Sequence, residues 1–201
     1  MNTFIGNHLK TVLEDRVPVL DAWRRQKMSV RRRPKNFENW LLVELVHHLW
    51  QKGVVDEVQT NGLVDGLPLK AAGLASRVRG PKAQSGTLSP DLSFRIKTHG
   101  IVDVEIKTGV SHTDIIDDLE VVRFYSEKGR ARPEFAWVIL IPEDAELEAA
   151  VTKGMNNIQT KARLSGIRFE FTEIKPWLRY AVWTPAGQAV QIGSAAPPNI
   201  R

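Results

Sequence analysis

The sequence predicts an α/β protein in which helices flank a central mixed sheet. Three stretches carry this prediction. Residues 37–52 repeat apolar side chains at helical spacing, residues 92–107 alternate apolar and polar side chains as paired strands do, and residues 135–141 form a continuous apolar run. A run of that kind is typical of a strand buried on both faces. With 201 residues the chain is long enough for one domain of ordinary size.

The N-terminal part is expected to be helical and then strongly basic. Residues 3–28 are predicted to form two helices, because Pro18 fits the first turn of a second helix better than the interior of a single one. Residues 24–35 hold seven basic residues and no acidic one. This basic arm is either a solvated linker or a segment that contacts phosphate groups. The predicted organisation is N-terminal helices and arm over 1–35, a core domain over 36–193 and a tail over 194–201.

The first half of the core is expected to be a helix, a strand and a long loop. A polar N-cap precedes the helix predicted over residues 37–52, and a glycine follows it. A strand is expected over residues 54–60. Residues 61–89 show no sustained period and contain five glycines, so they form either a flap along a ligand or a disordered loop. A short helix is expected within this loop near residues 67–74.

A hairpin follows, and it carries charge on a strand that is expected to be buried. Residues 92–97 and 101–107 are predicted to pair in antiparallel fashion around His99-Gly100. Apolar and charged side chains alternate along the second strand, so its charged residues share one face: Asp103, Glu105 and Lys107. Asp91 precedes the first strand, and we expect it near the end of the second strand, where Glu105 and Lys107 emerge.

The remaining elements alternate between helix and strand. They are expected to be a helix over 113–128, the buried strand over 135–141, a helix over 145–164, strands over 168–174 and 177–183, and a last strand over 189–192. Four acidic residues occupy the first turns of the 113–128 helix: Asp114, Asp117, Asp118 and Glu120. Because acids near a helix N-terminus complement its dipole, these four are expected to be structural.

Charged side chains on a buried strand need a partner, because an unpaired buried charge is costly. A divalent cation would satisfy Asp91 and Glu105 together. Hard cations such as Mg²⁺ bind carboxylate and carbonyl oxygens, which these two acids and the peptide oxygen of Ile106 could supply. Lys107 could then orient a metal-bound water or help to deprotonate it.

The same residues carry a resemblance. Pro90-Asp91, thirteen intervening residues and then Glu105-Ile106-Lys107 resemble the signature of the PD-(D/E)XK nuclease superfamily, which has the restriction-endonuclease-like fold. The resemblance covers residues 36–142. It implies an αβββαβ core, Mg²⁺-dependent hydrolysis of phosphodiester bonds with Asp91, Glu105 and Lys107 as catalytic residues, and one further acid on the preceding helix.

Two glutamates of the 37–52 helix are candidates for that further acid. We favour Glu44, which lies mid-helix between apolar neighbours, over Glu38, because Glu38 is also explained as a first-turn residue stabilised by the helix dipole. His47 and His48 follow on the same helix. Adjacent residues point about 100° apart on a helix, so these two cannot chelate one ion together.

Composition restricts the classes of function. The net charge of +5 and the pI near 9.6 are compatible with a polyanionic partner. The absence of cysteine excludes disulfides, thiolate zinc sites and cysteine nucleophiles. The glycines follow no nucleotide-binding spacing, and the Gly-x-Ser-x-Gly motif of serine hydrolases is absent. No apolar run approaches membrane-spanning length, so we expect a cytoplasmic protein without a membrane partner.

Together these observations predict a DNA endonuclease of the restriction or defence type, with Mg²⁺ as cofactor and Mn²⁺ able to replace it. Basic residues of the arm and the long loop are expected to contact the nucleic acid: Arg31, Arg32, Arg33, Lys35, Arg77, Arg79 and Lys82. A homodimer is expected if both strands of a duplex are cut symmetrically. Two alternatives stay open: an inactive nuclease fold that binds nucleic acid or a protein, and a plain cross-strand ion pair between Glu105 and Lys107.

Overall fold

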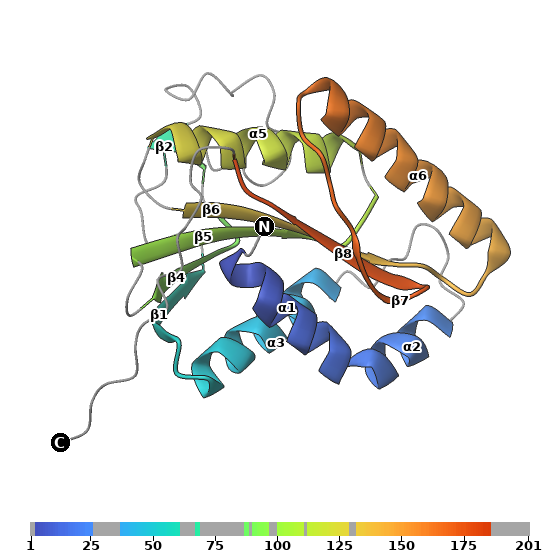
Figure 1. The fold of residues 1–201 in the computed structure, drawn as a ribbon, viewed down its shortest axis with the longest axis horizontal. Helices are drawn as coiled ribbons and strands as arrows, with labels where there is room; N and C mark the ends of the chain where they lie inside the picture. Colours follow the sequence, from blue (N-terminus) through green and yellow to red (C-terminus); the bar gives the residue numbers. More distant parts are fainter. Residues whose placement is uncertain are drawn as a thin grey trace.

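Helices cover both faces of one mixed six-stranded sheet in the computed structural model of the chain (Figure 1). The residues that the structure describes are 3–25, 37–60, 67–68, 87–88, 90–96, 100–110, 112–128 and 132–185. This arrangement confirms the predicted α/β class. Over those ranges, no helix combines the length and the apolar character needed to span a membrane.

The described part contains five helices: α1 (Phe4–Asp15), α2 (Val17–Arg25), α3 (Phe37–Gln51), α5 (His112–Lys128) and α6 (Ala145–Leu164). The main sheet has the strand order β1-β4-β5-β6-β8-β7, formed by β1 (Val55–Thr60), β4 (Leu92–Ile96), β5 (Gly100–Lys107), β6 (Arg132–Leu140), β8 (Leu178–Trp183) and β7 (Thr172–Lys175). Only β5 and β6 run parallel within this sheet. Two short strands, β2 (Leu67–Pro68) and β3 (Thr87–Leu88), pair separately.

Most of these bounds follow the sequence pattern, but the strand expected over residues 168–174 is shorter, because β7 begins at Thr172 and residues 168–171 are not in a strand. α3 ends before Gly53, whose φ of 62° is one that a residue with a Cβ rarely adopts. β4 and β5 pair in antiparallel fashion as predicted, but Gly100, which was expected in the turn, is the first residue of β5 and pairs with Ile96; its φ is 83°.

The prediction of a short helix near residues 67–74 is wrong at its start. Leu67 and Pro68 are strand residues, because the residue before a proline disfavours the helical conformation. Residues 69–74 lie outside the described residues, as do the expected last strand over 189–192 and the tail over 194–201.

The sheet separates two hydrophobic cores. Side chains of α1 and α3 pack against one face, which includes Val104 of β5. Side chains of α5 and α6 pack against the other face, which includes Trp137 of β6. α5 connects β5 to its parallel neighbour β6 over this second face, as Figure 1 shows. The parallel pair at the centre is therefore covered on both sides, as the apolar run over residues 135–141 predicted.

α1 is fixed to the sheet by a buried carboxylate. Glu134 of β6 accepts hydrogen bonds from the backbone N–H groups of Phe4 (2.9 Å) and Ile5 (2.8 Å) in the first turn of α1. These N–H groups have no partner within the helix, so the side chain from β6 satisfies them. Ile5 and other α1 residues belong to the same core as α3 and β5. The N-terminal helices thus belong to the same packed unit as the residues that follow the basic arm.

Candidate active site

The ends of β4 and β5 hold Asp91 and Glu105 side by side. The paired register of the two strands stops at Leu92 and Val104. Beyond it, side chains replace the ladder: Oδ2 of Asp91 accepts the N–H of Ile106 at 3.0 Å, and Oε2 of Glu105 accepts the N–H of Asp91 at 3.3 Å. Each acid is therefore held by the backbone of the other strand. The expectation that Asp91 lies at the end of β5 is confirmed.

Pro90 explains why the ladder stops there. Continuing the register by two residues places Pro90 opposite Ile106, and proline has no N–H to donate. In an antiparallel ladder, a residue directs its N–H and its C=O toward the same neighbour. Since the N–H of Ile106 points toward Asp91, the carbonyl oxygen of Ile106 also points toward the side of β5 on which Asp91 lies. Two carboxylates and one backbone carbonyl therefore share this strand end.

Lys107 is the only cationic side chain, among the described residues, at this end of β5 that contacts these acids. Its Nζ lies 3.1 Å from Oδ2 of Asp118, 3.5 Å from Oε1 of Glu38 and 3.8 Å from Oε1 of Glu105. Asp91 also acts on it electrostatically. Four carboxylates around one ammonium group give a net charge of −3 when all are ionised (−4 + 1). We call these five residues the acidic cluster: Glu38, Asp91, Glu105, Lys107 and Asp118.

The electrostatics of the acidic cluster fix the protonation state of Lys107. Burial disfavours its charge, but the carboxylates of Asp118, Glu105, Asp91 and Glu38 outweigh burial and raise the pKa of Lys107 above that of a free lysine. Burial raises the pKa of Glu38, against the effect of Lys107 and with a contribution from Asp91. Lys107 is therefore an ammonium ion at neutral pH. This state suits the orienting role and not that of a base.

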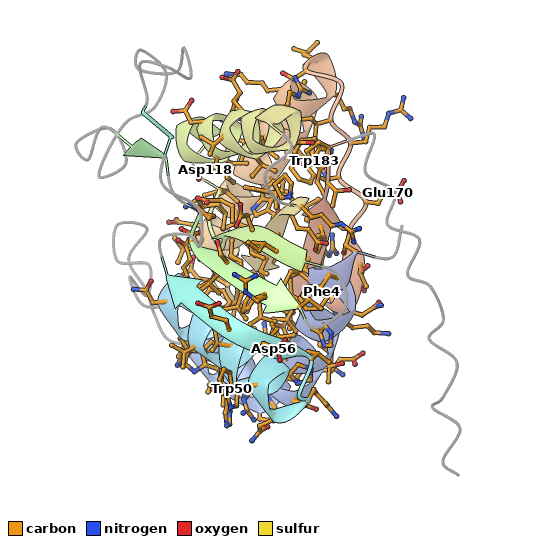
Figure 2. The ribbon with its side chains drawn as sticks, turned by 90° about the vertical axis from the view of Figure 1, so that its left-hand side faces the viewer. Phe4, Trp50, Asp56, Asp118, Glu170 and Trp183 are labelled. Carbon is orange, nitrogen blue, oxygen red and sulfur yellow. The ribbon has the colours of Figure 1, made fainter. Side chains whose placement is uncertain are left out.

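Asp118 is a member that the sequence analysis missed. It lies on α5, on the side toward the sheet, as Figure 2 shows, and its side chain is 11% exposed. The sequence predicts only a structural role for it near the start of the helix. One signal was available: Asp118 falls three residues after Ile115 and four before Val122, within the apolar stripe of α5. An acid in a buried stripe needs a partner, and here the partner is Lys107.

The acid supplied by α3 is Glu38 and not Glu44, which corrects the preference drawn from the sequence. Glu44 forms an ion pair with Arg16, with Oε2 2.8 Å from Nη2 and 2.9 Å from Nε. The two glutamates are six residues apart, so they lie about 120° apart around the helix and about 9 Å apart along it. The first turn of α3 reaches the end of β5, where Glu38 contacts Lys107. Glu38 therefore does more than stabilise the helix dipole from the first turn, because it also contacts Lys107.

The segment after Lys107 is held from two sides. Nε1 of Trp137 donates a hydrogen bond of 2.8 Å to the carbonyl of Gly109. Gly154 of α6 lies against Val110, and a Cβ at Gly154 would come within 2.9 Å of that side chain. The glycine inside α6 therefore allows the helix to approach the chain closely just beyond the acidic cluster.

Asp103 shares its face of β5 with Glu105 and Lys107, as predicted, but lies two residues farther than Glu105 from the strand end. Its Oδ1 accepts a hydrogen bond from the hydroxyl of Ser93 on β4. Burial raises the pKa of Asp103, against the effect of the Ser93 hydrogen bond. Asp103 is not among the neighbours that act on Lys107. We therefore do not include it in the acidic cluster.

The acidic cluster offers the donors that a hard cation requires. Excess negative charge, two adjacent carboxylates and a backbone carbonyl fit Mg²⁺, which commonly binds one or two carboxylates and keeps several waters. No group of three or more His, Cys, Asp or Glu side chains with metal-site geometry occurs among the described residues. A metal here would take its protein ligands from Asp91, Glu105 and Ile106.

The predicted nucleic-acid contacts fall outside the described residues: Arg31, Arg32, Arg33, Lys35, Arg77, Arg79 and Lys82. The chain matches no protein-family model, and comparisons with curated proteins and with solved structures find no similar protein. The functional argument therefore depends on the geometry of the acidic cluster and on the residues that form it.

Proposed function

We propose that the chain is a Mg²⁺-dependent nuclease that hydrolyses phosphodiester bonds in DNA. One observation carries the proposal: Asp91, Glu105 and Lys107 converge at the end of β5, in a site with more carboxylates than cations. A solvent-facing cross-strand ion pair, the plainest alternative, does not describe this site. Glu105 is only 2% exposed, and Lys107 contacts acids from two helices.

The order of elements supports the same proposal. Apart from the separate β2–β3 pair between β1 and β4, the chain order α3, β1, β4, β5, α5, β6 gives a helix, three antiparallel strands, a helix and a parallel strand. This is the αβββαβ order that the resemblance to PD-(D/E)XK nucleases implies. We propose that these elements form a restriction-endonuclease-like core, to which α1, α2 and the β7–β8 hairpin are added.

Each member of the acidic cluster then has a distinct task. Asp91, Glu105 and the carbonyl of Ile106 would hold the cation, which when bound stabilises negative charge on the phosphate and favours a hydroxide nucleophile. Lys107 donates hydrogen bonds as an ammonium ion and orients a water or a phosphate oxygen. Asp118 and Glu38 hold the Lys107 side chain from the two helix layers.

Cleavage assays test this proposal. Supercoiled plasmid, short labelled DNA and short labelled RNA are incubated with the protein in Mg²⁺, Mn²⁺ or EDTA. We expect cleavage of DNA in either metal and none in EDTA. Asp91→Asn and Lys107→Gln should each lower the rate at least about a hundredfold. Glu57→Gln on β1, which removes an exposed ion pair with Arg95 on β4, is the matched control and should keep the wild-type rate.

Other outcomes separate the alternatives. Wild-type protein that is folded but cuts neither DNA nor RNA in any metal contradicts the nuclease proposal. DNA binding without cleavage would identify the inactive binder. Double-strand breaks with a fixed pattern, together with a dimer in solution, would support the restriction or defence type and the homodimer. Scattered nicks from a monomer would count against both.

A further inference from the structure

α1 and α3 carry a pair of histidines where the two helices pack together. Nδ1 of His8 lies 3.3 Å from Nε2 of His48, and the ring centroids are 5.4 Å apart with an angle of 60° between the planes. Both side chains are partly buried. Phe4 packs against the His8 ring, with a centroid separation of 5.2 Å. Forty residues separate the two histidines, so tertiary packing alone brings them together.

We propose that His8 and His48 form a binding site for a first-row transition-metal ion, with Zn²⁺ as the reference case, separate from the acidic cluster. The nitrogen separation supports this assignment. At 3.3 Å one ring can donate a hydrogen bond to the other, and the same spacing suits two ligands of one ion. Two imidazole ligands of a tetrahedral ion, each about 2.0–2.1 Å from the metal, lie about 3.3–3.4 Å apart.

The charge state of the pair also suits a metal. Only neutral imidazole offers a lone pair to an ion. Burial lowers the pKa of His8, and His48 and Lys52 lower it further. Burial and Lys52 likewise lower the pKa of His48, while Asp15 opposes them. Both rings are therefore neutral at pH 7, although the Lys52 ammonium repels a cation and the Asp15 carboxylate offsets part of that repulsion.

The donor set determines which ion would bind. Imidazole nitrogen suits Zn²⁺, Cu²⁺ and Ni²⁺, whereas Mg²⁺ prefers the oxygens of the acidic cluster. No third His, Cys, Asp or Glu among the described residues completes the set. Two tetrahedral positions would thus be taken by water or by an external donor. The ion would link α1, which docks on Glu134, to α3, which supplies Glu38.

Titration calorimetry with ZnCl₂ tests the site. The titration uses protein without a histidine tag. It also contains excess Mg²⁺, which occupies sites made of oxygen donors. Wild type should bind one Zn²⁺, and His8→Gln and His48→Gln should each weaken binding at least tenfold. His47→Gln is the matched control, because this exposed neighbour lies on the same helix but outside the pair. Zinc should raise the melting temperature of wild type and His47→Gln only.

Two further measurements keep the proposal falsifiable if a variant folds poorly. One equivalent of Cu²⁺ on wild-type protein should give an electron paramagnetic resonance spectrum with coupling to two imidazole nitrogens. Zn²⁺ binding should persist in Asp91→Asn, so this site can fail or succeed independently of the nuclease proposal. Absence of saturable Zn²⁺ binding by wild type, or equal binding by the folded His8→Gln and His48→Gln variants, would overturn it.

Discussion

The neighbouring strands β5 and β6 each carry a buried glutamate, and the two are satisfied in opposite ways. Glu134 accepts two backbone N–H groups from the first turn of α1. Glu105 accepts one N–H from Asp91 and otherwise lies beside Lys107, which it shares with three other acids. Their exposed fractions are nearly equal, 4% and 2%. Burial alone therefore does not distinguish a structural acid from a functional one, but their partners do.

The difference follows from position in the sheet. Glu134 pairs in register with Val104, one residue before Glu105, and the two glutamates point to opposite faces. Glu134 faces α1, whose unsatisfied N–H groups complement its charge. Glu105 faces α5 at the strand end, where Asp118 adds a further negative charge. Repulsion between Glu105 and the neighbouring carboxylates lowers the stability of the fold, and a bound cation would offset this cost.

The largest effect is expected at Glu105. Glu105→Gln keeps the size of the side chain but removes a metal ligand, so DNA cleavage should fall at least about a hundredfold. Because the substitution also reduces repulsion within the acidic cluster, the melting temperature should not fall. Plasmid cleavage and thermal unfolding followed by circular dichroism measure the two effects. A variant that is less stable but cleaves at the wild-type rate would show that Glu105 is structural and not functional.

The opposite result is expected at Glu134. Glu134→Ala leaves the N–H groups of Phe4 and Ile5 without their acceptor, so the free energy of unfolding should fall by about 2–4 kcal/mol. Cleavage per folded molecule should be unchanged. Urea unfolding measures the loss, with Glu173→Ala on β7 as a control, because its ion pair with Arg179 is half exposed. A stability equal to that of wild type would show that α1 does not depend on this cap.

The two glutamates of α3 extend the comparison to a helix. Glu38→Gln removes one of the acids that hold Lys107 and should lower the cleavage rate about tenfold. Glu44→Gln breaks only the ion pair with Arg16, so the rate should stay the same and the free energy of unfolding should fall by less than about 1 kcal/mol. Single-turnover cleavage of labelled DNA separates the variants. A greater loss of rate in Glu44→Gln would restore the choice made from the sequence.

The smallest effect is expected in the dependence of stability on pH. Burial raises the pKa of Glu134 above its ordinary value of 4.5, although the N–H groups of Ile5 and Phe4 oppose the shift. The folded state therefore holds this proton more readily than the unfolded state. The associated stabilisation is complete below pH 4.5 and is lost as the pH rises through the folded pKa. Relative to Glu134→Gln, wild type should gain stability as the pH falls from 7 toward 4.5, measured by urea unfolding at each pH. A difference independent of pH would contradict the raised pKa.

Local patterns in the sequence were sufficient for most of the elements and for the central part of the site. The alternation over residues 92–107 predicted β4 and β5, and it also predicted that Asp103, Glu105 and Lys107 share a face. Helical spacing predicted α3, α5 and α6 to within one residue of their observed bounds. These features depend on the period of the backbone and on turn residues such as Gly53 and Gly100, which are properties of neighbours along the chain.

Only the tertiary structure decided which distant side chains complete each site. The placement of the helices over the sheet brings Asp118 and Glu38, but not Glu44, to Lys107. It also brings the first turn of α1 to Glu134. The contact between His8 and His48 has the same origin. The sequence by itself determined most of the strands and helices and the Asp91, Glu105 and Lys107 motif, because these follow from local periodicity. The partners of these residues were decided by packing, because burial and charge pairing act between segments far apart in the chain.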